Sequence, residues 1–308
     1  MKGRAQGSIP SMETQRRIVR LPNGRDLDVL TGGAESTDAF LLINGSPTGV
    51  AIYEPEIDAA ASRGLRFLTF ARPGYADSTR LPDRVVADIA PDVRALAGEL
   101  GLTRLFVLGW SGGGPHALAC GALLPDLVAG VATLGSVAPF DAEGLDWLDG
   151  MAPENQEEFG AAVEGTSALL PYLEAFAAGL RDVTGAQVAE ALGGLVPDVD
   201  RAALSGEFAD HQAALFRDSV RTGIWGGLDD DLAFIRDWGF DLAAIRVPVT
   251  IWQGMEDKMV PSAHGRWLVD HIPGSTPSVM DGEGHLSLAV TSFDLILDNL
   301  VGRRAVRA

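Results

Sequence analysis

The chain has 308 residues, of which 46% are hydrophobic and 21% are charged, a balance that indicates a soluble globular protein with one large core. The net charge of −18 argues against nucleic acid and against an anionic membrane surface as partners, because both repel an acidic protein. The single cysteine, Cys120, excludes an intramolecular disulfide and a cysteine metal cluster; no secretory signal or membrane span is visible, so we expect a cytoplasmic protein.

The first half of the chain predicts strands that alternate with helices. A hairpin is predicted from strands at 16–21 and 25–30, which are joined by an Asn-Gly pair that supplies the positive φ of a tight turn. Short apolar runs then predict strands, and apolar residues at helical spacing predict helices. The predicted strands are 39–43, 65–70, 105–108 and 128–134, and the predicted helices are 52–62 and 82–100. This alternation is typical of a mainly parallel sheet covered by helices on both faces.

The alternation stops between residues 139 and 241, where almost no strand-like run occurs. Helical pieces are predicted there at 156–163, 169–180, 187–192 and 210–222. Strands resume at 247–252 and 277–280, and a closing helix is predicted at 288–301. We therefore predict an α/β core formed by 16–138 and 242–302, an inserted all-helical segment at 139–241, and flexible termini at 1–15 and 303–308.

A G-x-S-x-G pentapeptide, Gly109-Trp110-Ser111-Gly112-Gly113, directly follows a predicted buried strand. A nucleophile on a sharp strand-to-helix turn needs small residues two positions before and two after it, because larger side chains collide. The pentapeptide alone is only moderately specific, since glycine-rich turns also follow strands for packing reasons. Ser111 is therefore a candidate nucleophile if the chain also supplies a base and an orienting acid.

Asp257 and His285 each come shortly after one of the last two predicted strands. Taken alone, Asp257 also fits a solvated loop acid or a helix cap, and Glu256 beside it competes for any catalytic role. Ser111, Asp257 and His285 all lie past the carboxyl ends of predicted strands, where sites form in open α/β sheets. Their order along the chain is the one described for hydrolases that carry serine on such a turn.

These motifs resemble the α/β-hydrolase superfamily. The resemblance covers about residues 16–302 and implies a mainly parallel eight-stranded sheet flanked by helices, with 139–241 as a helical lid. It is specific for the fold and for a serine triad, and weakly specific for substrate. The matching segments are the pentapeptide at 109–113, the G-x-x-D-x-x-V-P run at 254–261, the G-x-G-H at 282–285 and the R-P-G-Y-A-D-S loop at 72–78.

The resemblance implies a role for each of five residues. Ser111 would attack a carbonyl, His285 would take its proton, and Asp257 would orient the imidazole. The backbone N–H groups of Gly112 and Ser46 would form the oxyanion hole. A serine nucleophile argues against the relatives that open epoxides or remove halide, because an aspartate at this position marks those subgroups.

The substrate pocket is predicted from residues near these groups. Asn44, Gly45, Trp110 and Tyr53 are expected to line it. Many relatives carry His-Gly-x-Pro where this chain has Asn-Gly-Ser-Pro, so the match to the best-known His-Gly subgroups is loose. The acids between Asp141 and Glu158 are interpreted as a solvated face, with a site for a cationic leaving group as the alternative. His116, five residues beyond the serine, is interpreted as structural.

The expected function is hydrolysis of a small, mostly apolar ester, lactone, thioester or amide through an acyl-enzyme. No metal and no other cofactor is expected, the partner is a small-molecule substrate, and a homodimer is left open. One alternative is a non-hydrolytic triad enzyme of a natural-product pathway, such as an acyltransferase, cyclase, lyase or perhydrolase, because sequence does not tell whether water reaches the acyl-enzyme. The other is a small-molecule receptor that uses the same pocket.

Overall fold

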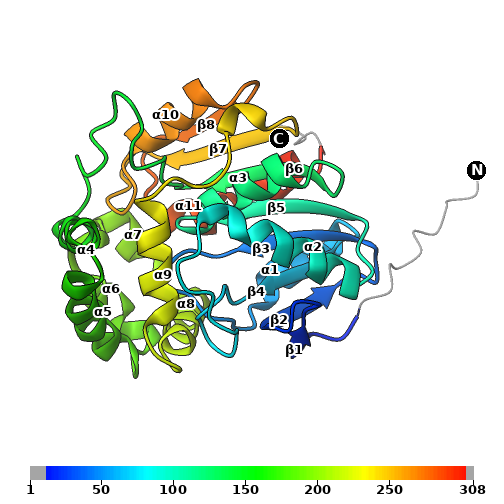
Figure 1. Cartoon of the computed structure of the whole chain (residues 1–308), viewed down its shortest axis with the longest axis horizontal. Coiled ribbons are helices and arrows are strands. Elements are labelled where there is room, and N and C mark those ends of the chain that lie inside the picture. Colours follow the sequence, from blue (N-terminus) through cyan, green and yellow to red (C-terminus); the bar gives the residue numbers. More distant parts are fainter. Residues whose placement is uncertain (1–11, 303–308) are drawn as a thin grey trace, which may run out of the picture.

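The computed structural model of the chain describes residues 12–302, which build one eight-stranded sheet (Figure 1). The strand order is β1-β2-β4-β3-β5-β6-β7-β8; β1–β2 and β2–β4 pair antiparallel, and all other neighbours pair parallel. The mainly parallel sheet predicted from the sequence is therefore confirmed. The strands are β1 Gln15–Arg20, β2 Asp26–Gly33, β3 Asp38–Ile43, β4 Arg66–Phe70, β5 Arg104–Trp110, β6 Val128–Leu134, β7 Val249–Gly254 and β8 Thr276–Met280.

Helices cover both faces of the sheet because successive side chains of a strand point to opposite faces. On β3, Leu41 and Ile43 pack in a core with α2, α3 and α10, whereas Phe40 and Leu42 pack in a second core with α1 and α11. The helices of these two layers are α1 Glu54–Ser62, α2 Ile89–Glu99, α3 Gly113–Leu123, α10 Ser262–His271 and α11 Ser287–Leu300. None of the helices within residues 12–302 is both long and apolar enough to cross a lipid bilayer.

Six further α-helices lie between β6 and β7 in the chain. Figure 1 shows them gathered at one end of the strands. They are α4 Pro153–Glu164, α5 Thr166–Leu180, α6 Val188–Ala191, α7 Asp198–Ala203, α8 Gly206–Ser219 and α9 Trp225–Phe234. We refer to them as the inserted helices.

The predicted elements differ from the observed ones mainly at three helices. The helix predicted at 82–100 begins only with the 3-10 turn Val86–Asp88, and the sequence did not predict α7 or α9. α9 contains Gly226, Gly227 and three consecutive aspartates, which are weak helix formers, so its helical structure depends on tertiary packing. Flexible termini were predicted at 1–15 and 303–308; of these, 1–11 and 303–308 lie outside the described residues, and Gln15 already belongs to β1.

A buried carboxylate joins the inserted helices to the core. Asp230 on α9 is 0% exposed, and its Oδ2 accepts hydrogen bonds from Arg72 Nη2 at 2.6 Å and from Tyr75 Oη at 2.8 Å. Arg84 Nη2 lies 2.9 Å from Oδ1, and Ser46 Oγ donates to Oδ2 at 2.7 Å. Burial alone would raise the pKa of Asp230, but the positive charges of Arg72 and Arg84 outweigh burial and hold this pKa well below its usual range. The ionised carboxylate therefore fixes α9 against core loops.

His116 on α3 belongs to the same cluster. Its imidazole is buried, with Nε2 3.4 Å from Asp230 Oδ1 and Nδ1 3.3 Å from the carbonyl oxygen of Val86. Burial lowers the pKa of His116. These contacts agree with the structural role interpreted from its position after the serine.

Replacing Asp230 with Asn should lower the free energy of unfolding by about 3–5 kcal/mol, because two guanidinium groups then lose their buried counter-charge. Urea denaturation measures this change. Glu174→Gln, which alters an exposed carboxylate on α5, should stay within about 0.5 kcal/mol of the wild type. An Asp230→Asn protein as stable as the wild type would show that the cluster does not hold α9.

Candidate active site

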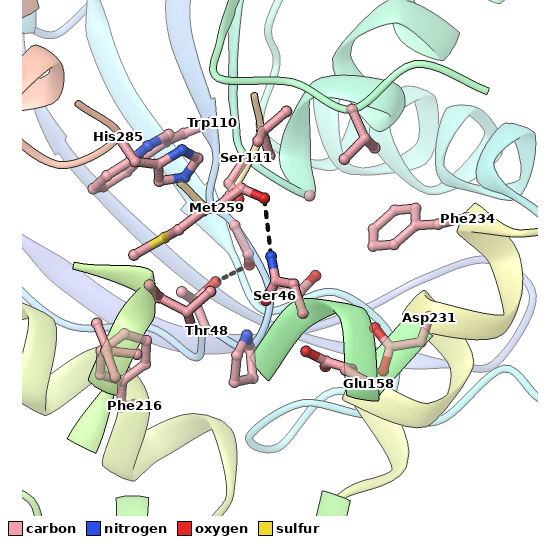
Figure 2. A pocket seen from close by; sticks show the side chains of 18 of the residues that line it. Ser46, Thr48, Trp110, Ser111, Glu158, Phe216, Asp231, Phe234, Met259 and His285 are labelled. Carbon is pink, nitrogen blue, oxygen red and sulfur yellow. Dashed lines mark hydrogen bonds between the residues drawn. The ribbon is translucent and has the colours of Figure 1, made fainter. Parts of the chain in front are cut away.

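A cavity of about 110 Å³, partly open to solvent, lies between the carboxyl ends of the central strands and the inserted helices. Ser111, Gly112, Gly45, Ser46, Trp110 and His285 line it from the core side. On the opposite side it is lined mostly by apolar side chains, namely Phe159, Phe176, Phe216 and Phe234 of the inserted helices and Leu192 and Leu195 between α6 and α7. Figure 2 shows this cavity from close by.

Ser111 occupies a strained turn between β5 and α3. Its φ is +55°, a left-handed value that L-residues rarely adopt. The two outer glycines of the pentapeptide permit this turn: a Cβ at Gly109 would lie 2.4 Å from the carbonyl oxygen of Gly113, and one at Gly113 would lie 1.9 Å from that of Ile43. Strain of this kind persists only where the surroundings enforce it and is concentrated at functional sites. The turn therefore holds the serine hydroxyl at the cavity wall.

His285 and Asp257 form a buried pair beside the serine turn. The imidazole Nδ1 lies 2.7 Å from Asp257 Oδ2, and both side chains are almost fully buried. Asp257 Oδ1 accepts the backbone N–H groups of Met259 and Val260 at 2.9 and 2.8 Å, which fixes the carboxylate. Burial lowers the pKa of His285, but the nearby negative charge of Asp257 outweighs it, so the net shift of this pKa is upward. Because Nδ1 faces Asp257, Nε2 is the nitrogen left for the cavity.

Asp200, on the inserted helix α7, holds the loop that carries His285. Its buried carboxylate accepts the backbone N–H groups of His285, Leu286 and Ser287 at 2.9, 2.9 and 2.8 Å. Its charge also contributes to the raised pKa of His285. The position of the imidazole thus depends on a residue far from it in sequence.

The loop after β3 passes directly beside the serine. A Cβ on Gly45 would lie 2.9 Å from Ser111 Cβ, and a Cβ on Gly112 would lie 2.6 Å from Ser46 Oγ. Arg72 holds this loop by donating hydrogen bonds to the carbonyl oxygens of Asn44 and Gly45, the latter at 2.8 Å. The two predicted oxyanion residues, Ser46 and Gly112, are therefore in contact.

The structure places the four predicted pocket residues in different surroundings. Gly45 and Trp110 line the cavity, and the Trp110 ring stacks on His285 with centroids 6.0 Å apart. Tyr53 instead lines a second cavity on the far side of Trp110, and it stacks on His211. Asn44 is buried, and its side-chain oxygen has no hydrogen-bond partner among the described residues.

Several cavity residues were not singled out from the sequence. Gln212 on α8 and Asp231 on α9 line the cavity, as does Glu158, which the sequence placed in a solvated face. The one signal in the sequence is the aspartate run at 229–231, which sits between the apolar residues Leu228 and Leu232 and so predicts buried carboxyl groups.

Comparisons with known proteins agree with this architecture. The family described as alpha/beta hydrolase fold matches residues 38–290 of the chain. No curated protein matches the sequence at a significant level.

Solved structures are similar over nearly the whole chain. An esterase from Exiguobacterium antarcticum has 19% sequence identity and a TM-score of 0.66, and the match covers 94% of this chain and 100% of that chain. An epoxide hydrolase from Vigna radiata has 18% identity and a TM-score of 0.70, with 94% and 97% covered. A hydrolase from Pseudomonas aeruginosa PA01 has 20% identity and a TM-score of 0.67, with 94% and 98% covered. These identities support the fold alone, whereas the family match spans most of the sequence, and the chain therefore belongs to the alpha/beta hydrolase fold family.

Proposed function

We propose that the protein is a serine hydrolase that cleaves a small, mostly apolar ester, lactone, thioester or amide through an acyl-enzyme on Ser111. The observation that carries this proposal is the short His285–Asp257 contact in a cavity that also holds Ser111 on a positive-φ turn. A serine hydroxyl is a weak nucleophile at its ordinary pKa and needs an adjacent base. His285 is the imidazole at the cavity wall, and the esterase among the similar structures belongs to the same fold.

In this mechanism, His285 Nε2 takes the proton of Ser111 as its Oγ attacks the carbonyl carbon, and later returns a proton to the leaving group. Asp257 keeps the proton on Nδ1 and stabilises the imidazolium that forms. The backbone N–H groups of Gly112 and Ser46 bind the oxyanion, at the N-terminus of α3. Water then hydrolyses the acyl-enzyme by the same steps.

The inserted helices act as a lid in this proposal. Their phenylalanine side chains, together with Leu192 and Leu195 between α6 and α7, line the cavity opposite Ser111, so the acyl or leaving group lies against apolar surface. A cavity enclosed between the core loops and the inserted helices suits a small molecule rather than a polymer.

Ser111→Ala should abolish labelling by a fluorophosphonate probe and lower the turnover of p-nitrophenyl butyrate by at least about 10⁴-fold, because the nucleophile is removed. Gel fluorescence and release of p-nitrophenol measure the two effects. The matched control is Ser167→Ala, an exposed serine on α5, which should label and turn over as the wild type does. Normal labelling of Ser111→Ala would contradict the proposal.

The activity should fall on the acid side as His285 becomes protonated, because only the neutral imidazole accepts the serine proton. Since the pKa of His285 is raised above the ordinary value of 6.5, the midpoint of the acid limb of kcat/KM should lie above that pH. A pH profile with p-nitrophenyl butyrate measures it.

Asp200→Asn should move this midpoint to lower pH, because the variant removes a negative charge that stabilises the imidazolium. Asp198→Asn, which changes an exposed aspartate on the same helix, should leave the midpoint in place. An unchanged midpoint in Asp200→Asn would mean that its carboxylate does not act on His285.

A further inference from the structure

The cavity that holds Ser111 has a second polar region, formed by two carboxyl groups. Glu158 on α4 and Asp231 on α9 both line the cavity, and Figure 2 shows their side chains next to each other, apart from Ser111 and His285 in the view. Of the described residues that line the cavity, none is a lysine or an arginine. The pair therefore faces a mostly apolar space without a counter-charge of its own.

The environment of the pair disfavours two negative charges. Asp231 is 3% exposed, and its Oδ2 has no hydrogen-bond donor within the described part of the chain. Burial raises the pKa of Glu158 to about 7 and raises the pKa of Asp231 well above its usual range. The negative charges of Glu158 and Asp230 also raise the pKa of Asp231, and Arg84, whose positive charge lowers it, is already paired with Asp230. Without a cation between them, two carboxyl groups this close cannot both be ionised.

An independent observation on a third helix indicates a ligand at this site. Gln212 on α8 lines the same cavity and is 3% exposed, and its Nε2 has no acceptor among residues 12–302. A buried amide donor without a partner costs about 1–3 kcal/mol. Such a donor is expected where a bound molecule supplies the acceptor.

We propose that the cavity binds a substrate with an apolar body and a protonated amine, and that Glu158 and Asp231 hold the amine. An ammonium group has three N–H donors and no acceptor, so it can bond to both carboxylates, including the unpartnered oxygen of Asp231. Its positive charge offsets the repulsion between them, and Gln212 donates to an acceptor elsewhere on the substrate. This inference rests on the proposed function, because it names the substrate class of the same cavity.

Glu157 and Glu158 show why a solvated acidic face does not account for the pair. Glu157 is exposed on α4, as a solubilising acid would be. Glu158 is partly buried, lines the cavity and lies beside Asp231. The two neighbouring residues therefore provide a matched comparison, with the same charge, the same helix and different surroundings.

Binding of benzylamine, which is protonated near neutral pH, should be compared with binding of the uncharged benzyl alcohol by isothermal titration calorimetry. In wild-type and Ser111→Ala proteins the amine should bind at least about tenfold more tightly, equivalent to about 1.4 kcal/mol. Glu158→Gln and Asp231→Asn should each reduce this preference to less than about threefold, because the paired negative charge is lost. Glu157→Gln should keep the full preference.

Three results would overturn the inference: equal affinity for the amine and the alcohol, no binding of either, or a preference that survives in both pair variants. If Glu157→Gln also lost the preference for the amine, the preference would come from the overall negative charge of the protein, which also overturns the inference.

The amine proposal and the Ser111 proposal can fail independently of each other. If Ser111 is not a nucleophile, probe labelling fails while the amine preference remains; if the amine site is wrong, labelling of Ser111 is unaffected.

Discussion

The buried carboxylate of Asp230 is the constraint on which the cavity depends. It binds Arg72, and Arg72 in turn donates to the carbonyl oxygens of Asn44 and Gly45, in the loop that passes beside Ser111. Burying an ion pair costs the hydration of both charges, and only close, well-oriented partners offset that cost. A single residue of an inserted helix therefore fixes the loop that carries one proposed oxyanion donor.

The neighbours of Asp230 extend this effect, because consecutive residues of a helix point about 100° apart. Asp229 binds Arg80 through contacts of 2.8 and 2.9 Å, Asp230 binds the guanidinium cluster, and Asp231 faces the cavity. Two of the three carboxyl groups have arginine partners, and the third has Glu158. The aspartate run thus anchors α9 to the core with two of its members and sets the polarity of the cavity with the third.

The sequence predicted the features that depend on local residues. The strands, the tight pentapeptide turn and the order of Ser111, Asp257 and His285 follow from short motifs and apolar runs, and the structure places Ser111 and His285 on one cavity. What it did not predict depends on contacts between distant segments. Asp200 contacts the His285 loop from 85 residues away in sequence, and no local pattern indicates that partner.

Tyr53 was expected in the pocket for a similar reason. Its position after β3 places it near the active edge of the sheet, but the Trp110 side chain separates it from the cavity that holds the serine. Closeness to β3 in the sequence therefore does not tell on which side of the Trp110 ring Tyr53 lies. The helix α9 was missed because its glycines and aspartates favour other conformations, and packing against Tyr75 and the arginines overrides that preference.

Each of three core loops is bonded to a different inserted helix. α9 reaches the loop after β3 through Asp230, α7 reaches the His285 loop through Asp200, and α4 reaches the loop after β7 through a hydrogen bond of 2.9 Å from Asn155 Nδ2 to the carbonyl oxygen of Met259. Lifting the inserted helices away as one body would break all three connections at once, including the two that involve buried carboxylates. Opening of the cavity is therefore expected to involve smaller movements of the segments between these contacts, while the loops of Ser46, Asp257 and His285 keep their positions. In this arrangement the inserted helices are part of the framework that orients the proposed catalytic groups, as well as the wall that the substrate meets.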